Sequence, residues 1–195
     1  MEILTPIITR RSIRKHKDIP VEDDKIDAML ECARRAPSGD NSQPWNFIIV
    51  KSKEIKERIT EACHSQEWML QAPVFIVCVA DMGVRFKEIN QDTQDFVYSD
   101  ISEDSPQEEV KLIIRDTTIA IDHLVLQAEA MGLGTCWVAW FNQINIRPIL
   151  KVDSDKYVIA VICVGYADEK PEPRPRKSLK DMVHYEVWGR PKGAC

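Results

Sequence analysis

The segment from Val110 to Gly134, VKLIIRDTTIAIDHLVLQAEAMGLG, limits the fold more than any other stretch of the chain. Its apolar positions recur at helical spacing, and they cover more than one side of the helix that this spacing predicts. A helix that is apolar over much of its surface belongs at the centre of a fold or at an interface. Gly132 and Gly134 suit the C-terminal cap of such a helix. We therefore expect one long central helix with the rest of the chain packed around it.

Shorter elements on both sides of this helix predict an α+β fold. Residues 21–36 and 52–63 have the periodicity of amphipathic helices, and a short helix is expected at about 145–150. Apolar runs predict strands at residues 46–50, 73–80, 135–141 and 157–165. The run at 73–80 is continuous rather than alternating, which predicts a strand covered on both faces. A chain of 195 residues with this pattern is expected to form a single domain over residues 1–195.

Composition excludes several classes of protein. The apolar fraction of 44% is ordinary for a globular protein, and the longest apolar runs fall well short of the roughly 20 residues of a membrane-spanning helix. A net charge of −5 argues against a nucleic-acid partner. None of the six cysteines forms a C-x-x-C pair and the four histidines are scattered, so no metal site is expected. We expect a cytoplasmic protein with reduced thiols, no membrane partner and no signal peptide.

Two segments differ from the rest in composition. Residues 88–109 contain eight acidic residues and no lysine or arginine, which indicates a surface excursion or a lid over approximately residues 82–110. Residues 167–195 are rich in proline near their start, which predicts an extended C-terminal segment.

A basic cluster lies close to the N-terminus, in the sequence TRRSIRKH at residues 9–16. Within the first twenty residues, five basic groups stand against two acidic ones, although the whole chain is acidic. Such a cluster is either a solvated basic surface or a socket for an anion. Arginine forks with a neighbouring hydroxyl are the groups that bind a phosphate best. Arg10, Arg11 and Arg14 around Ser12 supply that combination.

Two further segments carry groups that suit a ligand. The loop RAPSGDNSQPW at residues 35–45 is either a polar turn or a set of hydrogen-bonding groups for a planar heterocycle. The segment PEPRPRK at residues 171–177 is by itself an extended tail with solvated charges. The Rossmann, P-loop and nucleophile-elbow motifs are all absent from the sequence.

Taken together, these segments resemble the FMN-dependent nitroreductase family. The resemblance rests on four motifs in family order over nearly the whole chain, namely RRSIR, APSGDNSQPW, GLGTCWVAWF and VGYADEKPEPRPRK. The sequence departs from the family in the acidic excursion and at Ala139–Trp140, where several relatives carry a small glycine. A bulkier pair there narrows the space over the flavin and bears on the choice of substrate.

The resemblance implies a homodimer with a mixed sheet wrapped by helices, the long central helix at the interface, and one FMN bound between the subunits at each site. Residues 167–195 would embrace the partner subunit. Arg10, Arg11 and Ser12 would lie at the phosphate or ribityl end, and Arg14 beside N1 and the C2 carbonyl, where a cation stabilises the reduced ring. The rest of the implied FMN site consists of Arg174 and Arg176 at the phosphate, Gly134 and Ala139 along the flavin, with the Ala139 amide near N5, and Pro37, Ser38, Gly39, Asn41 and Gln43 from the partner.

The activity implied is reduction of electron-poor small molecules, such as nitroaromatics or quinones, by ping-pong hydride transfer from a transiently bound NADH or NADPH. No catalytic side chain is assigned. The excursion 88–109, with Phe96 and Tyr98, would form part of a lid that sets acceptor choice. The same fold also serves reductive dehalogenases of iodinated tyrosine and an enzyme that consumes FMN to make dimethylbenzimidazole. A non-catalytic FMN-binding protein and an FMN-free adaptor are the remaining alternatives.

Overall fold

The structure is a computed structural model that describes residues 3–86 and 108–193 of the chain. The lid expected over about residues 82–110, with Phe96 and Tyr98, lies largely outside the described residues, so its role stays a prediction. Among the described residues, no helix combines the length and apolar character needed to cross a membrane.

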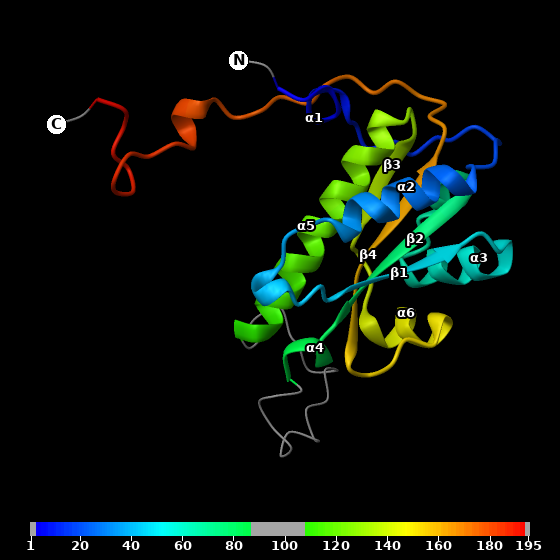
Figure 1. The fold of residues 1–195 in the computed structure, drawn as a ribbon. Helices are drawn as coiled ribbons and strands as arrows, with labels where there is room; N and C mark the ends of the chain where they lie inside the picture. The colour runs from blue at the N-terminus through cyan, green and yellow to red at the C-terminus, as the bar shows by residue number, and fades with distance from the viewer. Residues whose placement is uncertain (1–2, 87–107, 194–195) are drawn as a thin grey trace.

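A four-stranded sheet forms the middle of the molecule (Figure 1). Its strands are β1 (Trp45–Val50), β2 (Val74–Asp81), β3 (Gly134–Val138) and β4 (Lys156–Gly165), in the spatial order β1-β2-β4-β3. Each neighbouring pair is antiparallel. The parallel pairing of the expected mixed sheet is a single bridge between Ser12 and Thr135 at the β3 edge. The four predicted strands are therefore confirmed, and the basic segment joins them at this edge.

Helices are present at the segments where the periodicity predicts them, and the structure contains additional short helices. The longer helices are α2 (Asp23–Arg34), α3 (Lys53–Ala62), α5 (Glu108–Ala130) and α6 (Gln143–Leu150). Two short α-helices, α1 (Thr5–Thr9) and α4 (Gly83–Phe86), and the 3-10 turns η1 (Gly39–Asn41), η2 (Glu67–Gln71) and η4 (Leu179–Asp181) accompany them. The sequence does not predict α1, because its five residues are too few to show a helical period.

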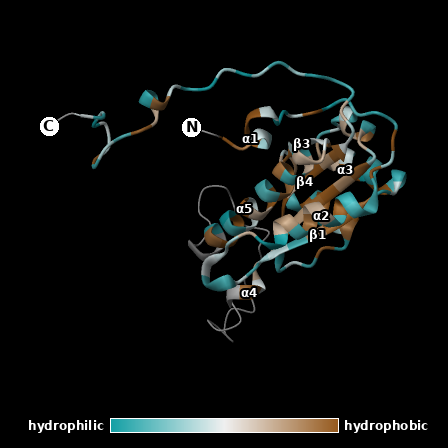
Figure 2. Ribbon diagram, turned by 45° about the horizontal axis from the view of Figure 1, so that its top comes forward, coloured by the Kyte–Doolittle hydropathy of each residue, from teal (hydrophilic) through white to brown (hydrophobic). Residues whose placement is uncertain are grey.

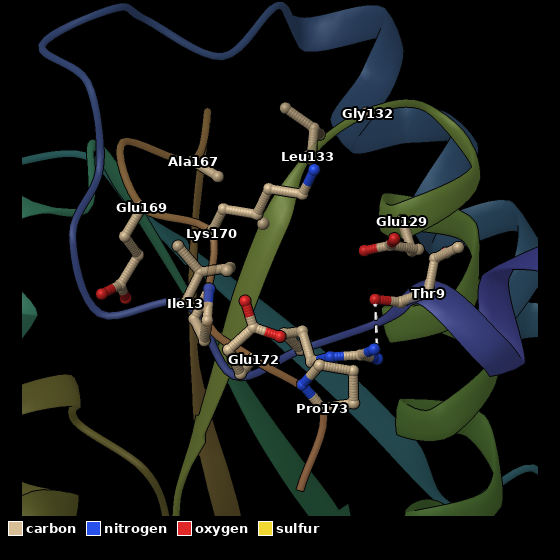
Figure 3. A pocket seen from close by; sticks show the side chains of 13 residues that line it. Thr9, Ile13, Glu129, Gly132, Leu133, Ala167, Glu169, Lys170, Glu172 and Pro173 are labelled. Atoms are coloured by element: carbon tan, nitrogen blue, oxygen red, sulfur yellow. Dashed lines mark hydrogen bonds between the residues drawn. The ribbon is translucent and has the colours of Figure 1, made fainter.

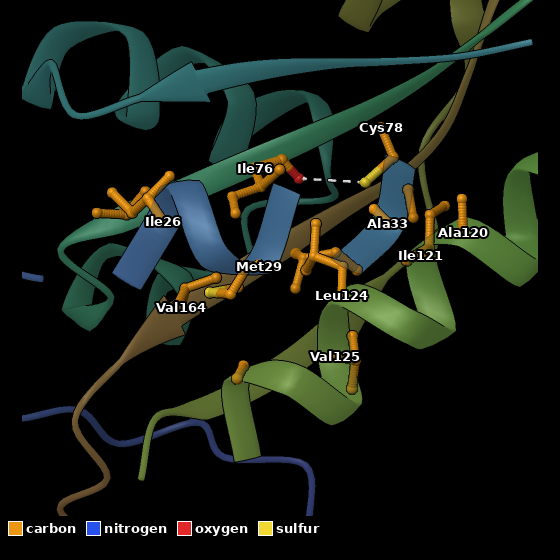
Figure 4. Close-up of a cluster of buried hydrophobic side chains, with 14 of the residues drawn as sticks. Ile26, Met29, Ala33, Ile76, Cys78, Ala120, Ile121, Leu124, Val125 and Val164 are labelled. Atoms are coloured by element: carbon orange, nitrogen blue, oxygen red, sulfur yellow. Dashed lines mark hydrogen bonds between the residues drawn. The ribbon is translucent and has the colours of Figure 1, made fainter. Parts of the chain in front are cut away.

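Helices cover both faces of the sheet. On one face α2 and α5 pack over β2 and β4, with Met29, Ile121 and Leu124 fully buried against Ile76 (Figure 4). On the other face α3 and α6 cover a second cluster around Phe75. The strands are accordingly the most apolar part of the ribbon in Figure 2. The central strand β2 is buried along almost its whole length, as expected for a strand covered on both faces.

The long central helix ends as predicted at one glycine but not at the other. Gly132 has a φ of +77° and the Leu133 N–H donates to the Ala128 carbonyl at 2.9 Å, which is a glycine C-cap. Gly134 is instead the first residue of β3. Its role is steric, because the Ile13 side chain occupies the space that a β-carbon would need, with Ile13 Cγ1 only 2.7 Å from that position.

Candidate functional site

The basic segment after α1 runs along the edge of the sheet and is fixed there by its backbone. The Ile13 N–H donates to the Thr135 carbonyl of β3 at 2.9 Å, and the Lys17 N–H donates to the Tyr166 carbonyl at 2.8 Å. An antiparallel bridge joins His16 to Ala167. The segment therefore contacts both the first residues of β3 and the chain that leaves β4.

Glu169 fastens the same segment to the start of the C-terminal segment. Its Oε1 accepts hydrogen bonds from the backbone N–H groups of Arg14, at 2.5 Å, and Lys15, at 3.1 Å. The Asp168 N–H donates in turn to the Lys15 carbonyl at 2.9 Å. The hydrogen bond from the Arg14 N–H is the main reason why the pKa of Glu169 lies below its usual value. Residues near the two ends of the chain are thus joined at one point.

This junction forms a cavity of about 710 Å³ between α1, the basic segment and the C-terminal segment. Five arginines line it against two glutamates, so its lining is net positive. The six predicted phosphate-end and N1-edge residues all lie in its wall: Arg10, Arg11, Ser12, Arg14, Arg174 and Arg176. The cavity thus unites the two basic segments that the sequence analysis considered separately.

Arg11 has a structural contact that the sequence analysis missed. Its Nη1 donates to the carbonyls of Ile8, Thr9 and Arg10 at 2.8–2.9 Å, which satisfies the free carbonyl groups at the end of α1. The bond to Thr9 is drawn in Figure 3. Part of the Arg11 guanidinium is therefore committed to the protein, whereas Arg10 donates no hydrogen bond from its side chain to a described residue.

A second cavity of about 610 Å³ adjoins the first and shares part of its wall (Figure 3). Gly134 and Leu133 of the β3 edge line it, together with Glu129 of α5 and the root of the C-terminal segment. Of the two residues predicted along the flavin, Gly134 lies in this wall. Ala139, which follows β3, lines neither cavity.

The predicted heterocycle loop is held at the other end of α5. The Gly39 N–H donates to Oδ2 of Asp116 at 2.9 Å, and Asp116 is a buried residue with 4% of its surface exposed. Within the loop, the Gln43 N–H donates to Ser38 Oγ at 3.0 Å. Asn41 and Gln43 adopt a positive φ, so the loop has a defined shape rather than being a simple turn. The sequence alone does not connect Asp116 to this loop, because 77 residues separate Gly39 from Asp116.

The predicted site is therefore divided within one chain. Asp116, which holds the loop of residues 37–43, precedes Glu129 of the second cavity by 13 helical residues, which at 1.5 Å per residue is about 20 Å. Figure 1 shows the loop near the start of α5 and the basic segment near its end. Pro37, Ser38, Gly39, Asn41 and Gln43 line neither of the two cavities.

The chain is similar in sequence and in fold to several known proteins. A model of the nitroreductase family matches residues 7–166. A Bacillus subtilis protein named as an NAD(P)H FMN reductase is 29% identical over 96% of this chain and 74% of its own length. The solved FMN-dependent nitroreductase of Clostridium difficile is 30% identical, with a TM-score of 0.74 over 94% of this chain and 98% of that one. The Vibrio harveyi NADPH:FMN oxidoreductase, solved with NAD+, is 25% identical with a TM-score of 0.80, over 94% of this chain and 76% of that one.

Proposed function

The chain belongs to the nitroreductase family, and from that premise we propose that it is an FMN-dependent oxidoreductase that uses NADH or NADPH to reduce electron-poor small molecules. Nitroaromatics and quinones are the acceptor classes we propose. The observation that carries this proposal is the cavity in which arginines from residues 10–14 meet Arg174 and Arg176.

The residues of this cavity fit the phosphate end of FMN. Guanidinium forks bind a phosphate dianion through charge-assisted, bidentate hydrogen bonds, and the Ser12 hydroxyl lies in the same wall. None of the ion pairs between described residues involves Arg10, Arg174 or Arg176. The volume of the cavity, about 710 Å³, also lies within the roughly 300–1,000 Å³ that is usual for cofactor sites. We assign the phosphate to Arg10, Ser12, Arg174 and Arg176.

Arg14 has a different task in this proposal. Its Cζ lies 5.5 Å from the centroid of the Trp68 ring, which is a cation–π contact that none of the other arginines of the cavity makes with a described ring. FMN held in this site would supply the hydride chemistry that connects NADH or NADPH with the acceptor. A cation held beside N1 and the C2 carbonyl would stabilise the negative charge that arrives there. Glu169 holds the Arg14 backbone, so it fixes the position of that cation.

We propose that the working unit is a homodimer in which each FMN lies between subunits. The separation of about 20 Å along α5 between Asp116, which holds the loop 37–43, and Glu129 of the second cavity supports this, because the partner would have to supply the loop. The C-terminal segment supports it as well, since it leaves the body of the chain (Figure 1). Its apolar residues Leu179, Val187 and Trp188 are 73%, 62% and 90% exposed. A partner surface that buried these side chains would be stabilised by removing them from water.

Absorption spectroscopy tests the proposed function directly. The purified protein, loaded with FMN, should show the two visible bands of a bound flavin, and NADH or NADPH should bleach them without oxygen. Adding a quinone should then restore the bands. A protein that retains no flavin absorbance after free FMN has been removed would contradict the cofactor assignment. A flavin that neither donor bleaches would leave a non-catalytic FMN-binding protein or another flavoenzyme of this fold.

We also propose a cytoplasmic location. The five cysteines in the described part of the chain are free thiols, and four of them are buried, which suits a reducing compartment. Fractionation of cells that express the protein would test this location.

A further inference from the structure

Two loops on the α3 and α6 face of the sheet meet through a pair of stacked rings. His64 follows α3, and Trp140 lies between β3 and α6. Their ring centroids are 4.0 Å apart with an interplanar angle of 20°. Trp140 nevertheless keeps 67% of its surface exposed. Because His64 covers one face of the indole, most of this exposure belongs to the opposite face and the rim.

The backbone at His64 indicates that this ring is held in place. His64 and Ser65 have φ values of +58° and +51°, in the left-handed region that residues with a β-carbon rarely adopt. The Gln66 side chain donates to the Cys63 carbonyl at 3.0 Å and the Glu67 N–H to the Ser65 carbonyl at 2.9 Å, which stabilise the turn. Strained backbone of this kind persists where the surrounding structure requires it, and it is common at ligand sites.

In the proposed site, the stacked pair would lie beside the flavin edge. Trp140 directly follows Ala139, whose amide we expect near N5 of the flavin. The segment that carries His64 also carries Trp68, which lies under the guanidinium of Arg14. Residues 64–68 therefore contact both the proposed N1-edge cation and the exposed tryptophan.

We propose, on the basis of the proposed function, that the open face of Trp140 is a stacking site for the planar, electron-poor ring of the acceptor. The indole face is electron-rich, so it attracts a ring whose own face is depleted by nitro or carbonyl groups. His64 supports the indole from behind and limits its rotation. The pair would give the enzyme a preference for flat aromatic acceptors over acceptors without a ring.

The test compares two acceptors that take electrons from the same reduced flavin. Menadione is a planar quinone, and ferricyanide has no ring. The wild-type protein, Trp140→Ala and Trp140→Phe are assayed with FMN bound and with one donor at a fixed concentration. Trp140 is exposed, so its replacement leaves the core intact.

We expect Trp140→Ala to raise the KM for menadione about fivefold to tenfold, the factor that corresponds to one aromatic stack, with little change in kcat. Trp140→Phe keeps a flat ring and should stay within about threefold of the wild type. The kcat/KM for ferricyanide should change less than about twofold in both variants, because no stack is lost. His64→Asn removes the supporting ring but keeps a residue that tolerates the left-handed backbone, and it should raise the KM for menadione in the same direction.

Equilibrium dialysis of menadione against the oxidised, FMN-loaded proteins provides a readout without turnover. Its Kd should rise in Trp140→Ala by the same factor as the KM. This binding can be measured even if neither donor bleaches the flavin, so failure of the proposed function and failure of the stacking site are distinguishable. An unchanged Kd for menadione in Trp140→Ala would overturn the proposal. Equal losses with menadione and ferricyanide, or a weaker dimer, would also overturn it and indicate a structural role for Trp140.

Discussion

Replacing Gly134 by alanine perturbs the contact that holds the basic segment against the sheet. A β-carbon at this position would lie 2.7 Å from Cγ1, 2.9 Å from Cβ and 3.0 Å from Cγ2 of Ile13. These atoms belong to the branch point of the side chain rather than to a flexible end. The backbone at Ile13 must therefore move away from β3, and the 2.9 Å hydrogen bond from Ile13 N–H to Thr135 is weakened.

The size of the effect follows from these contacts. Overpacking of a buried site costs about 1–3 kcal/mol, and a weakened backbone hydrogen bond adds up to about 1 kcal/mol. We expect Gly134→Ala to lower the free energy of unfolding by about 2 kcal/mol. In a domain of this size that corresponds to a fall in Tm of about 4–8 °C. Because Ser12 and Arg14 flank Ile13, the affinity for FMN should fall by about tenfold or more, since one tenfold step is only about 1.4 kcal/mol.

Thermal unfolding and FMN titration, both at fixed protein concentration, measure these two quantities. Gly83→Ala is the control, because its β-carbon would meet only the carboxylate ends of Asp81 and Asp155, at 3.2 and 3.5 Å. That variant should stay within about 0.5 kcal/mol of the wild type. If Gly134→Ala were as stable as Gly83→Ala and bound FMN as tightly as the wild type, the close packing of the basic segment on β3 would not position the site.

The remaining predictions concern three acidic or titratable side chains around the site. Glu169→Ala should weaken FMN binding about tenfold, because the Arg14 and Lys15 N–H groups lose their acceptor. Glu169→Gln keeps an acceptor oxygen, so the Kd for FMN should change less than about threefold. If both variants weakened FMN binding equally, the charge of Glu169 would matter rather than its hydrogen bonds. Burial lowers the pKa of His16 below its ordinary value of 6.5, so near and below pH 6.5 the unfolded chain binds more protons than the folded one. The contribution of His16 to the free energy of unfolding should therefore be fully present above about pH 6.5 and decrease as the pH falls below that value. Urea midpoints measured between about pH 8 and about pH 5 should fall less in His16→Phe than in the wild type. Asp116→Ala leaves the Gly39 N–H without its acceptor and should destabilise the chain by about 1–3 kcal/mol; an unchanged urea midpoint would show that the loop is held by other contacts.

Much of the fold could be predicted because its elements carry strong periodic signals. The central helix and the four strands are long and apolar, and each was expected near its observed bounds. The helix α1 has only five residues and none of them is buried, so no hydrophobic period exists to reveal it. The contact of Arg11 with the end of α1 was missed for the same reason.

The sequence identified the phosphate-end residues of the site but not how they are held together. Arg10 and Arg176 line one cavity because Glu169 contacts a backbone 155 residues away, and no local pattern reveals such a pairing. The bond from Gly39 to Asp116 is equally long-range. Nothing in the sequence next to either carboxylate indicates its partner. Their roles emerge only once the chain is folded.

The central claim is that arginines from both ends of the chain hold the phosphate of FMN. The most direct measurement is the Kd for FMN and for riboflavin, which lacks the phosphate, in the wild type and in the double variant Arg174→Gln with Arg176→Gln. A hydrogen bond to a charged group contributes about 1.5–3 kcal/mol, so FMN binding should weaken by more than about tenfold. Riboflavin binding should change less than about twofold, because no phosphate contact is lost. Equal weakening of both ligands, or no change for FMN, would contradict the phosphate assignment.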